Sequence, residues 1–180
     1  MAQTKVDLAL VLAVDVSFSM EPDEQDLQRR GFVQAFQSPE VHRAIRQGVQ
    51  GRIAVVYVEW SGAFDQQIIV PRTVIEQPDD GLVFAKRLLQ GPAHRMGYTS
   101  ISGAIDFGVR QLRERGLQAD RQVIDVSGDG ANNSGRTVPL ARDEALARGI
   151  TINGLPIMLR RSGSIWASAR PSCSHPTVTP

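Results

Sequence analysis

The chain has 180 residues, of which 42% are hydrophobic and 22% charged, and its formal net charge is +1. This length is typical of one domain with a sizeable core. The single cysteine, Cys173, excludes an internal disulfide and a cysteine-based metal site. Because the sequence has no basic stripe and no apolar run near the roughly 20 residues of a membrane helix, we expect neither nucleic-acid binding nor membrane insertion.

Apolar runs and stretches of helical periodicity alternate along the chain. Seven consecutive apolar residues at 8–14 predict a first strand at 6–14 that is buried on both faces. The remaining elements are expected, in chain order, as a helix opened by residues 21–24 and ending near 38, a short helix at 41–47, strands at 53–58 and 66–70, helices beginning at 78 and 101, a strand at 123–126, a helix from 137 to 149 and a strand at 150–155.

This alternation predicts an α/β fold with an open, doubly wound, mostly parallel sheet and helices on both faces. The strand at 66–70 follows its predecessor through a tight turn and ends at Pro71, which suits a sheet edge, so we expect one antiparallel edge strand. From Leu159 onward Ser, Arg and Pro dominate. We therefore divide the chain into a domain at 1–158 and a disordered or atypical tail at 159–180.

Oxygen-bearing side chains follow the first predicted strand and recur at two later positions. Asp15, Ser17 and Ser19 alternate directly after that strand, Thr99 precedes a helix, and Asp129 follows the strand at 123–126. Loops at the carboxyl ends of parallel strands can converge on one edge of the sheet. Two carboxylates and three hydroxyls suit Mg²⁺ or Mn²⁺ and not Zn²⁺. Such a set leaves a coordination position for an outside ligand, for which a partner's Asp or Glu carboxylate is suited.

Asp15-x-Ser17-x-Ser19, followed by Thr99 and Asp129, resembles the metal-ion-dependent adhesion site of von Willebrand factor A-type domains. Residues 14–20, 58–62 and 124–133 are similar to a bacterial branch of uncharacterised proteins with this domain. The resemblance, over residues 6–158, implies that Ser17 and Ser19 bind the metal directly. It implies that Thr99 does so in a ligand-engaged state and through water otherwise, and that Asp15 and Asp129 bind directly or through water.

The same resemblance implies protein–protein contact, with the metal bridging to a carboxylate of the partner. Domains of this family normally continue with another strand and a C-terminal helix after the strand at 150–155. Residues 159–180 show neither pattern, so we expect that strand and helix to be missing.

Two other functions stay open. One is a metal-dependent hydrolase such as a phosphatase, although enzymes with an aspartyl nucleophile generally need Asp-x-Asp where this chain has Ser17 in the third position. The other is an inert, truncated family member. Because the sequence shows no nucleophile–base pair, we expect a binding module and not an enzyme. The partner's identity and the oligomeric state stay open. No signal peptide is visible, which predicts a cytoplasmic location as written, or a periplasmic or secreted one if a leader lies outside this sequence.

Other polar and aromatic residues receive structural interpretations. Asp125 lies inside a strand, and we expect backbone groups or an arginine to satisfy it in preference to a role behind the metal site. His94 is expected at the surface. The aromatic residues around the second strand are expected to pack in the core or at the sheet edge: Tyr57, Trp60 and Phe64.

Overall fold

A computed structural model describes residues 3–92 and 94–157. Its elements are β1 (Thr4–Asp15), α1 (Pro22–Gln37), α2 (Pro39–Arg46), β2 (Ile53–Trp60), β3 (Gln66–Ile75), α3 (Pro78–Gln90), α4 (Ile101–Leu112), β4 (Leu117–Gly128), α5 (Val138–Leu146) and β5 (Ile150–Pro156). The strands form one sheet in the order β3-β2-β1-β4-β5, in which only β2 and β3 pair antiparallel. The predicted α/β fold and its antiparallel edge strand are confirmed.

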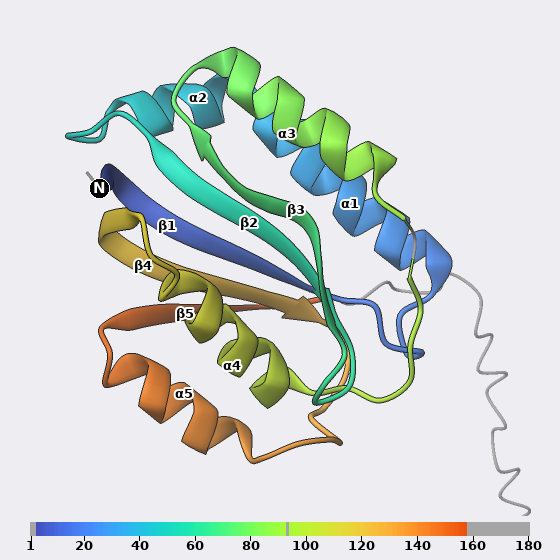
Figure 1. Cartoon of the computed structure of the whole chain (residues 1–180). Coiled ribbons are helices and arrows are strands. Elements are labelled where there is room, and N and C mark those ends of the chain that lie inside the picture. The colour runs from blue at the N-terminus through green and yellow to red at the C-terminus, as the bar shows by residue number, and fades with distance from the viewer. Residues whose placement is uncertain (1–2, 93, 158–180) are drawn as a thin grey trace, which may run out of the picture.

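Helices cover both faces of the sheet, with α1, α2 and α3 on one side and α4 and α5 on the other (Figure 1). The central strand β1 sends alternate side chains to the two faces. Val11 and Ala13 pack in the core beneath α4 and α5, while Leu12 and Val14 pack in the core beneath α1 and α3. Coverage on both faces explains why the sequence of β1 is continuously apolar where it is buried.

α1, α2, α3 and α5 each have a proline in the first turn, and α2 begins at Pro39, two residues before its predicted start. α4 has no proline there and begins after Ser100, whose hydroxyl accepts from the backbone N–H of Gly103 at 3.1 Å. In α1 the Glu24 carboxylate accepts a hydrogen bond from the backbone N–H of Glu21 at 2.9 Å. In α3 the Asp80 carboxylate accepts one from Gln77, also at 2.9 Å. Each contact satisfies a backbone donor that the helix itself leaves unpaired.

All five strands extend beyond their predicted bounds, and β3 and β4 do so by the largest margins. β3 continues past Pro71 to Ile75, because the register against β2 shifts between the Tyr57–Val70 and Val55–Thr73 pairs. A register shift of this kind accommodates a residue that lacks an N–H. β4 begins at Leu117 instead of Val123, and its first half is polar, so the apolar pattern did not reveal it.

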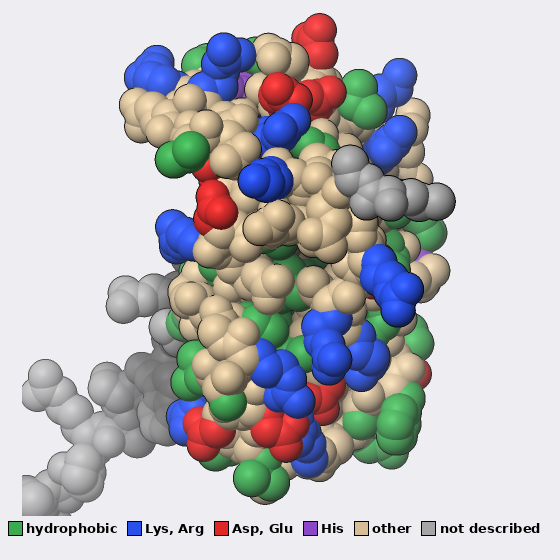
Figure 2. All heavy atoms as spheres, turned by 60° about the vertical axis from the view of Figure 1, so that its left-hand side comes forward, with side chains coloured by type: hydrophobic (Ala, Val, Ile, Leu, Met, Phe, Trp, Pro, Cys, Tyr) green, Lys and Arg blue, Asp and Glu red, His purple; other side chains and the backbone are tan. Residues whose placement is uncertain are grey.

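The sheet topology brings the carboxyl ends of β1, β2 and β4 to one edge of the molecule. None of the helices in the described parts of the chain is long and apolar enough to cross a membrane. The face shown in Figure 2 carries basic side chains beside acidic ones and not a field of one sign. The predictions for the tail at 159–180 and for a missing C-terminal strand and helix lie outside the described residues, and they stay predictions.

Candidate metal centre

Asp15 is the innermost residue of the predicted site. It is the last residue of β1 and is fully buried. One carboxylate oxygen, Oδ1, accepts a hydrogen bond from the backbone N–H of Ser17 at 2.8 Å, whereas Oδ2 has no hydrogen-bond partner among the described residues. Burial raises the pKa of Asp15 from 3.8 to about 6, and the hydrogen bond from Ser17 opposes this rise. A buried carboxylate oxygen without a partner is a position where a cation fits.

The other four predicted residues form a continuous chain of oxygen atoms. The Thr99 hydroxyl lies 3.2 Å from Ser17 Oγ, which lies 2.9 Å from Ser19 Oγ. Ser19 Oγ in turn donates a hydrogen bond of 2.6 Å to Asp129 Oδ1. Adjacent ligands of an octahedral Mg²⁺ ion with bonds of 2.0–2.1 Å lie about 2.9 Å apart. The structure therefore brings these four residues together at spacings that fit such an ion, and Asp15 adjoins them through its hydrogen bond to the Ser17 backbone.

Two glycines allow the loop that carries Asp129 to approach this cluster. A Cβ atom at Gly128 would lie 2.7 Å from Asp15 Oδ2, and one at Gly130 would lie 3.4 Å from Ser19 Oγ. A side chain at Gly128 would thus occupy the space beside the unpaired carboxylate oxygen. Glycine at this position keeps that space open.

The site has a buried and an exposed half. Asp15, Ser17 and Thr99 are buried, whereas Ser19 and Asp129 are exposed. A cation held among them would be protected on the protein side and accessible from outside. Two carboxylates would balance a divalent charge, and the exposed side is where an external oxygen ligand could approach.

Two asparagines that sequence analysis did not assign to the site hold the Thr99 loop in place. The backbone N–H of Thr99 donates to Asn133 Oδ1 at 2.8 Å, and the backbone N–H of Asn133 donates to the Thr99 carbonyl at 2.9 Å. Asn132 Oδ1 accepts from the backbone N–H of Ser102 at 3.1 Å. In the sequence, two adjacent asparagines are typical of a turn. Only their position shortly after Asp129 indicated that they lie near the site.

The backbone on the other side of Thr99 is also unusual. Tyr98 has a φ of 65°, in the left-handed region that non-glycine residues rarely adopt. Next to it, the isolated bridge between Ser17 and Met96 ties this loop to the end of β1. Residues held in such conformations cluster at functional sites, where the surrounding contacts enforce them.

A buried ion-pair network lies at the carboxyl end of β2. Glu59, which is 3% exposed, pairs with Arg29 of α1, and its Oε2 lies 3.3 Å from His94 Nδ1. Arg29 also donates to the carbonyls of Gly91 and Pro92, at 2.8 and 2.9 Å. The network joins β2, α1 and the segment that leads to Thr99. Sequence analysis gave Glu59 no role and placed His94 at the surface; His94 is instead half-buried against this carboxylate.

Two further interpretations need correction. Asp125 accepts a hydrogen bond of 2.6 Å from Asn153 Nδ2 of β5, so a side-chain amide satisfies it in place of the expected backbone group or arginine. Tyr57 and Trp60 are buried as expected, but Phe64 is 96% exposed. The turn after β2 turns Phe64 outward, which its aromatic character alone did not predict.

The described residues contain no group of three or more His, Cys, Asp or Glu side chains placed to hold a metal ion. The five-residue cluster is not a group of this kind, because three of its members carry hydroxyls and only two carry carboxylates. Its donor set is all oxygen, which matches the preference of hard divalent cations.

Solved structures of two other proteins share this fold. Proximal thread matrix protein 1 (PTMP1) from the mussel byssus aligns with a TM-score of 0.59 and 17% identity, over 87% of this chain and 39% of its own. An aerotolerance-related membrane protein from Bacteroides fragilis NCTC 9343, with multiple mutations to serines, aligns with a TM-score of 0.58 and 20% identity, over 84% of this chain and 68% of its own. This chain thus spans 39% of the length of the mussel protein.

Another structure of the mussel protein has a zinc-occupied MIDAS motif, the metal-ion-dependent adhesion site. At these identities the likeness shows the fold alone, an α/β fold with a mostly parallel sheet as the sequence predicts. No curated protein matches the sequence significantly. The model of one protein family, described as "Protein of unknown function (DUF1194)", matches residues 5–171. Because this match covers most of the chain, the protein belongs to the DUF1194 family.

Proposed function

We propose that the chain is a protein-binding module that depends on a divalent cation, held by Asp15, Ser17, Ser19, Thr99 and Asp129. The observation that supports this proposal is the chain of close oxygen contacts among Thr99, Ser17, Ser19 and Asp129. Asp15 adjoins it through the Ser17 backbone and has an Oδ2 that is buried and unpaired among the described residues. Mg²⁺ or Mn²⁺ is the proposed ion, because hard cations prefer oxygen ligands. When bound, the ion would supply a positive centre for an oxygen ligand from outside.

The proposed external ligand is an Asp or Glu carboxylate of a partner protein. Ser19 and Asp129 lie at the exposed side of the cluster, from which such a group can approach. Two exposed aromatic residues adjoin this side: Phe18, which is 62% exposed, and Tyr98, which is 72% exposed. Exposed aromatic side chains are typical of protein interfaces. This combination favours a partner segment in which an acidic residue stands beside apolar ones.

Binding is favoured over catalysis by the composition of the cluster. Its exposed members are one hydroxyl and one carboxylate, and Ser17 takes the place where a second aspartate would act in an aspartyl phosphatase. The resemblance to a bacterial branch of this domain supports the same proposal, as does the zinc-occupied site of the mussel protein, for that protein.

Calorimetric titration tests the site directly. We expect Mg²⁺ or Mn²⁺ to give saturable binding heat with the wild-type chain and none with Asp15→Ala. Asp125→Asn is a matched control, because Asp125 is a half-buried carboxylate on β4 that bonds to Asn153 and lies outside the cluster. Zn²⁺ serves as a comparison ion. Equal heats for wild type and Asp15→Ala would contradict the proposed site.

A second measurement separates the partner from the metal. A peptide library displayed on phage, selected on the immobilised chain in Mg²⁺ at roughly 100 times the Kd measured by calorimetry, should enrich sequences with Asp or Glu beside apolar residues. The selected peptides should be released by EDTA. Retention of the peptides in EDTA would show that the metal does not bridge to them, even where calorimetry shows that it binds.

A further inference from the structure

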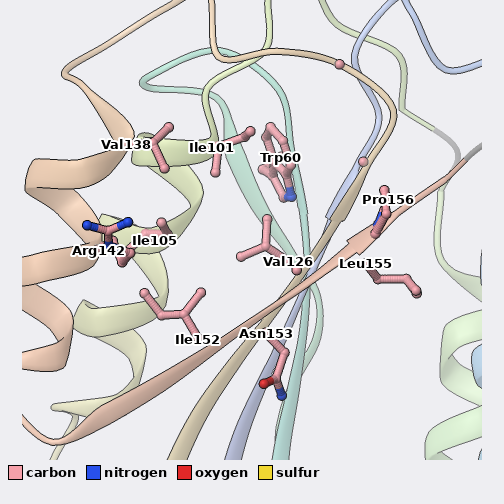
Figure 3. Close-up of a pocket in the computed structure, with 13 residues that line it drawn as sticks. Trp60, Ile101, Ile105, Val126, Val138, Arg142, Ile152, Asn153, Leu155 and Pro156 are labelled. Carbon is pink, nitrogen blue, oxygen red and sulfur yellow. The ribbon is translucent and has the colours of Figure 1, made fainter.

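Apart from the metal cluster, the molecule has a hollow on the face of the sheet that α4 and α5 cover. It is lined by residues other than the five proposed ligands. Its volume is about 340 Å³, within the range of small-molecule sites. In Figure 3 its walls come from β2, β4, β5 and the first turns of α4 and α5. The large side chains that line it are mainly apolar: Trp60, Ile101, Ile105, Val126, Val138 and Ile152.

Trp60 brings an unpaired polar group to this hollow. The residue is 1% exposed, and its indole N–H has no hydrogen-bond partner among the described residues. In Figure 3 the nitrogen lies on the edge of the ring that faces Val126. A buried donor without a partner costs about 1–3 kcal/mol. An oxygen atom of a ligand in the hollow could accept this hydrogen bond and remove that cost.

Arg142 gives the hollow a positive charge. Among the described residues that line it, Arg142 is the only charged one, and in Figure 3 it lies across the open space from Trp60. Its ion pair is with the adjacent Asp143, and both side chains are more than half exposed, at 52% and 61%. Such an exposed pair holds its partners weakly. The guanidinium is therefore free to attract an anion into the hollow.

We propose that this hollow binds a small monocarboxylate with an apolar chain. The chain would pack against Val126, Val138 and Ile152, and an oxygen of the ligand would accept the Trp60 N–H. The charge of Arg142 would favour the carboxylate over an uncharged molecule of the same length. This site goes beyond the proposed metal-dependent function and does not require it, because none of the metal ligands lines the hollow.

The hollow nevertheless lies directly beside the metal cluster. Gly128 and Gly130, which flank Asp129, form part of its lining. A ligand bound there would contact the backbone of the loop that carries a proposed metal ligand. All binding measurements on the hollow are therefore made first in EDTA, so that a failure of the metal site and a failure of the hollow give different results.

The probe is octanoate, and 1-octanol is its uncharged counterpart. The chain has two tryptophans, Trp60 and Trp166, so 5-fluorotryptophan labelling gives two ¹⁹F resonances, and Trp166→Phe identifies that of Trp60. We expect octanoate to shift the Trp60 resonance of the full chain saturably. We expect 1-octanol to bind about tenfold more weakly, because it lacks the negative charge that the field of Arg142 attracts.

Three variants test the assigned contacts by calorimetry with octanoate. Arg142→Gln should reduce the tenfold preference for octanoate to less than about twofold. Arg148→Gln, a matched control just after α5 and outside the hollow, should keep the preference. Val138→Phe places a ring into the hollow from a half-buried position and should abolish binding.

Three outcomes would overturn the proposal. One is a Trp60 resonance that does not shift when octanoate is added, as would happen if another part of the chain filled the hollow. Another is equal affinity for octanoate and 1-octanol, which would mean that charge plays no part. The third is octanoate affinity that survives Val138→Phe, which would place the ligand elsewhere.

Discussion

Replacing Asp15 with Asn should stabilise the metal-free protein at pH 8 and remove its response to Mg²⁺. Burial raises the pKa of this carboxyl from 3.8 to about 6 in the folded chain. A pKa raised on folding means that stability is fully present below pH 3.8 and is lost as the pH rises through about 6. The loss at pH 8 amounts to about 3 kcal/mol. Asn removes the charge and retains an oxygen that can accept from Ser17.

Urea unfolding in EDTA at pH 4 and pH 8 measures this effect. The free energy of unfolding of Asp15→Asn, relative to wild type, should increase by about 2–3 kcal/mol between the two pH values, since all other titrating groups cancel in the difference. Mg²⁺ at 100 times its Kd should stabilise wild type by about 2.7 kcal/mol and leave the variant unchanged. Asp125→Asn should behave as wild type towards Mg²⁺.

Identical pH dependence of wild type and Asp15→Asn would refute the reasoning, because it would show that the charge of Asp15 is not a cost in the metal-free fold. Full stabilisation of Asp15→Asn by Mg²⁺ would refute the assignment of this residue to the ion.

Three further substitutions test the surroundings of the site. Glu59→Gln should destabilise the fold by about 3 kcal/mol, because it leaves a mostly buried arginine without its counter-charge, whereas Asp26→Asn in an exposed pair should cost less than about 0.5 kcal/mol in the same urea experiment. Asn133→Ala should weaken Mg²⁺ binding by about tenfold in calorimetry, as is usual for residues that orient a ligand, and an unchanged Kd would contradict that role. Gly128→Ala should cost about 1–3 kcal/mol in thermal or urea unfolding, since its Cβ would lie 2.7 Å from Asp15, and an unaltered stability would show that the loop yields.

The sequence predicted the architecture because its main signal, apolar periodicity, is local. The apolar run of β1 and the proline-marked helix starts depend only on neighbours in the chain. β4 was predicted only where it is apolar. Its first half, from Leu117, is fixed by pairing with the start of β1, a partner more than a hundred residues away in sequence that local patterns do not reveal.

The five candidate ligands could be predicted because each stands next to a predicted strand or helix end. The residues that orient them could not. Asn133 acts through a hydrogen bond to Thr99, 34 residues earlier, and Glu59 through Arg29, 30 residues earlier. Such pairings depend on how loops are placed after the chain has folded. The exposure of Phe64 depends in the same way on the path of one turn.

The central position of β1 has a consequence for synthesis of the protein. β1 is translated first, yet its two neighbours in the sheet, β2 and β4, follow much later. Ser19 and Asp129, which touch in the folded chain, are 110 residues apart. At roughly 5–20 residues per second, the second emerges from the ribosome roughly 6–22 s after the first. During that interval the apolar strand has no complete sheet to join. The nascent chain should therefore be a substrate for ribosome-associated chaperones until β4 has emerged.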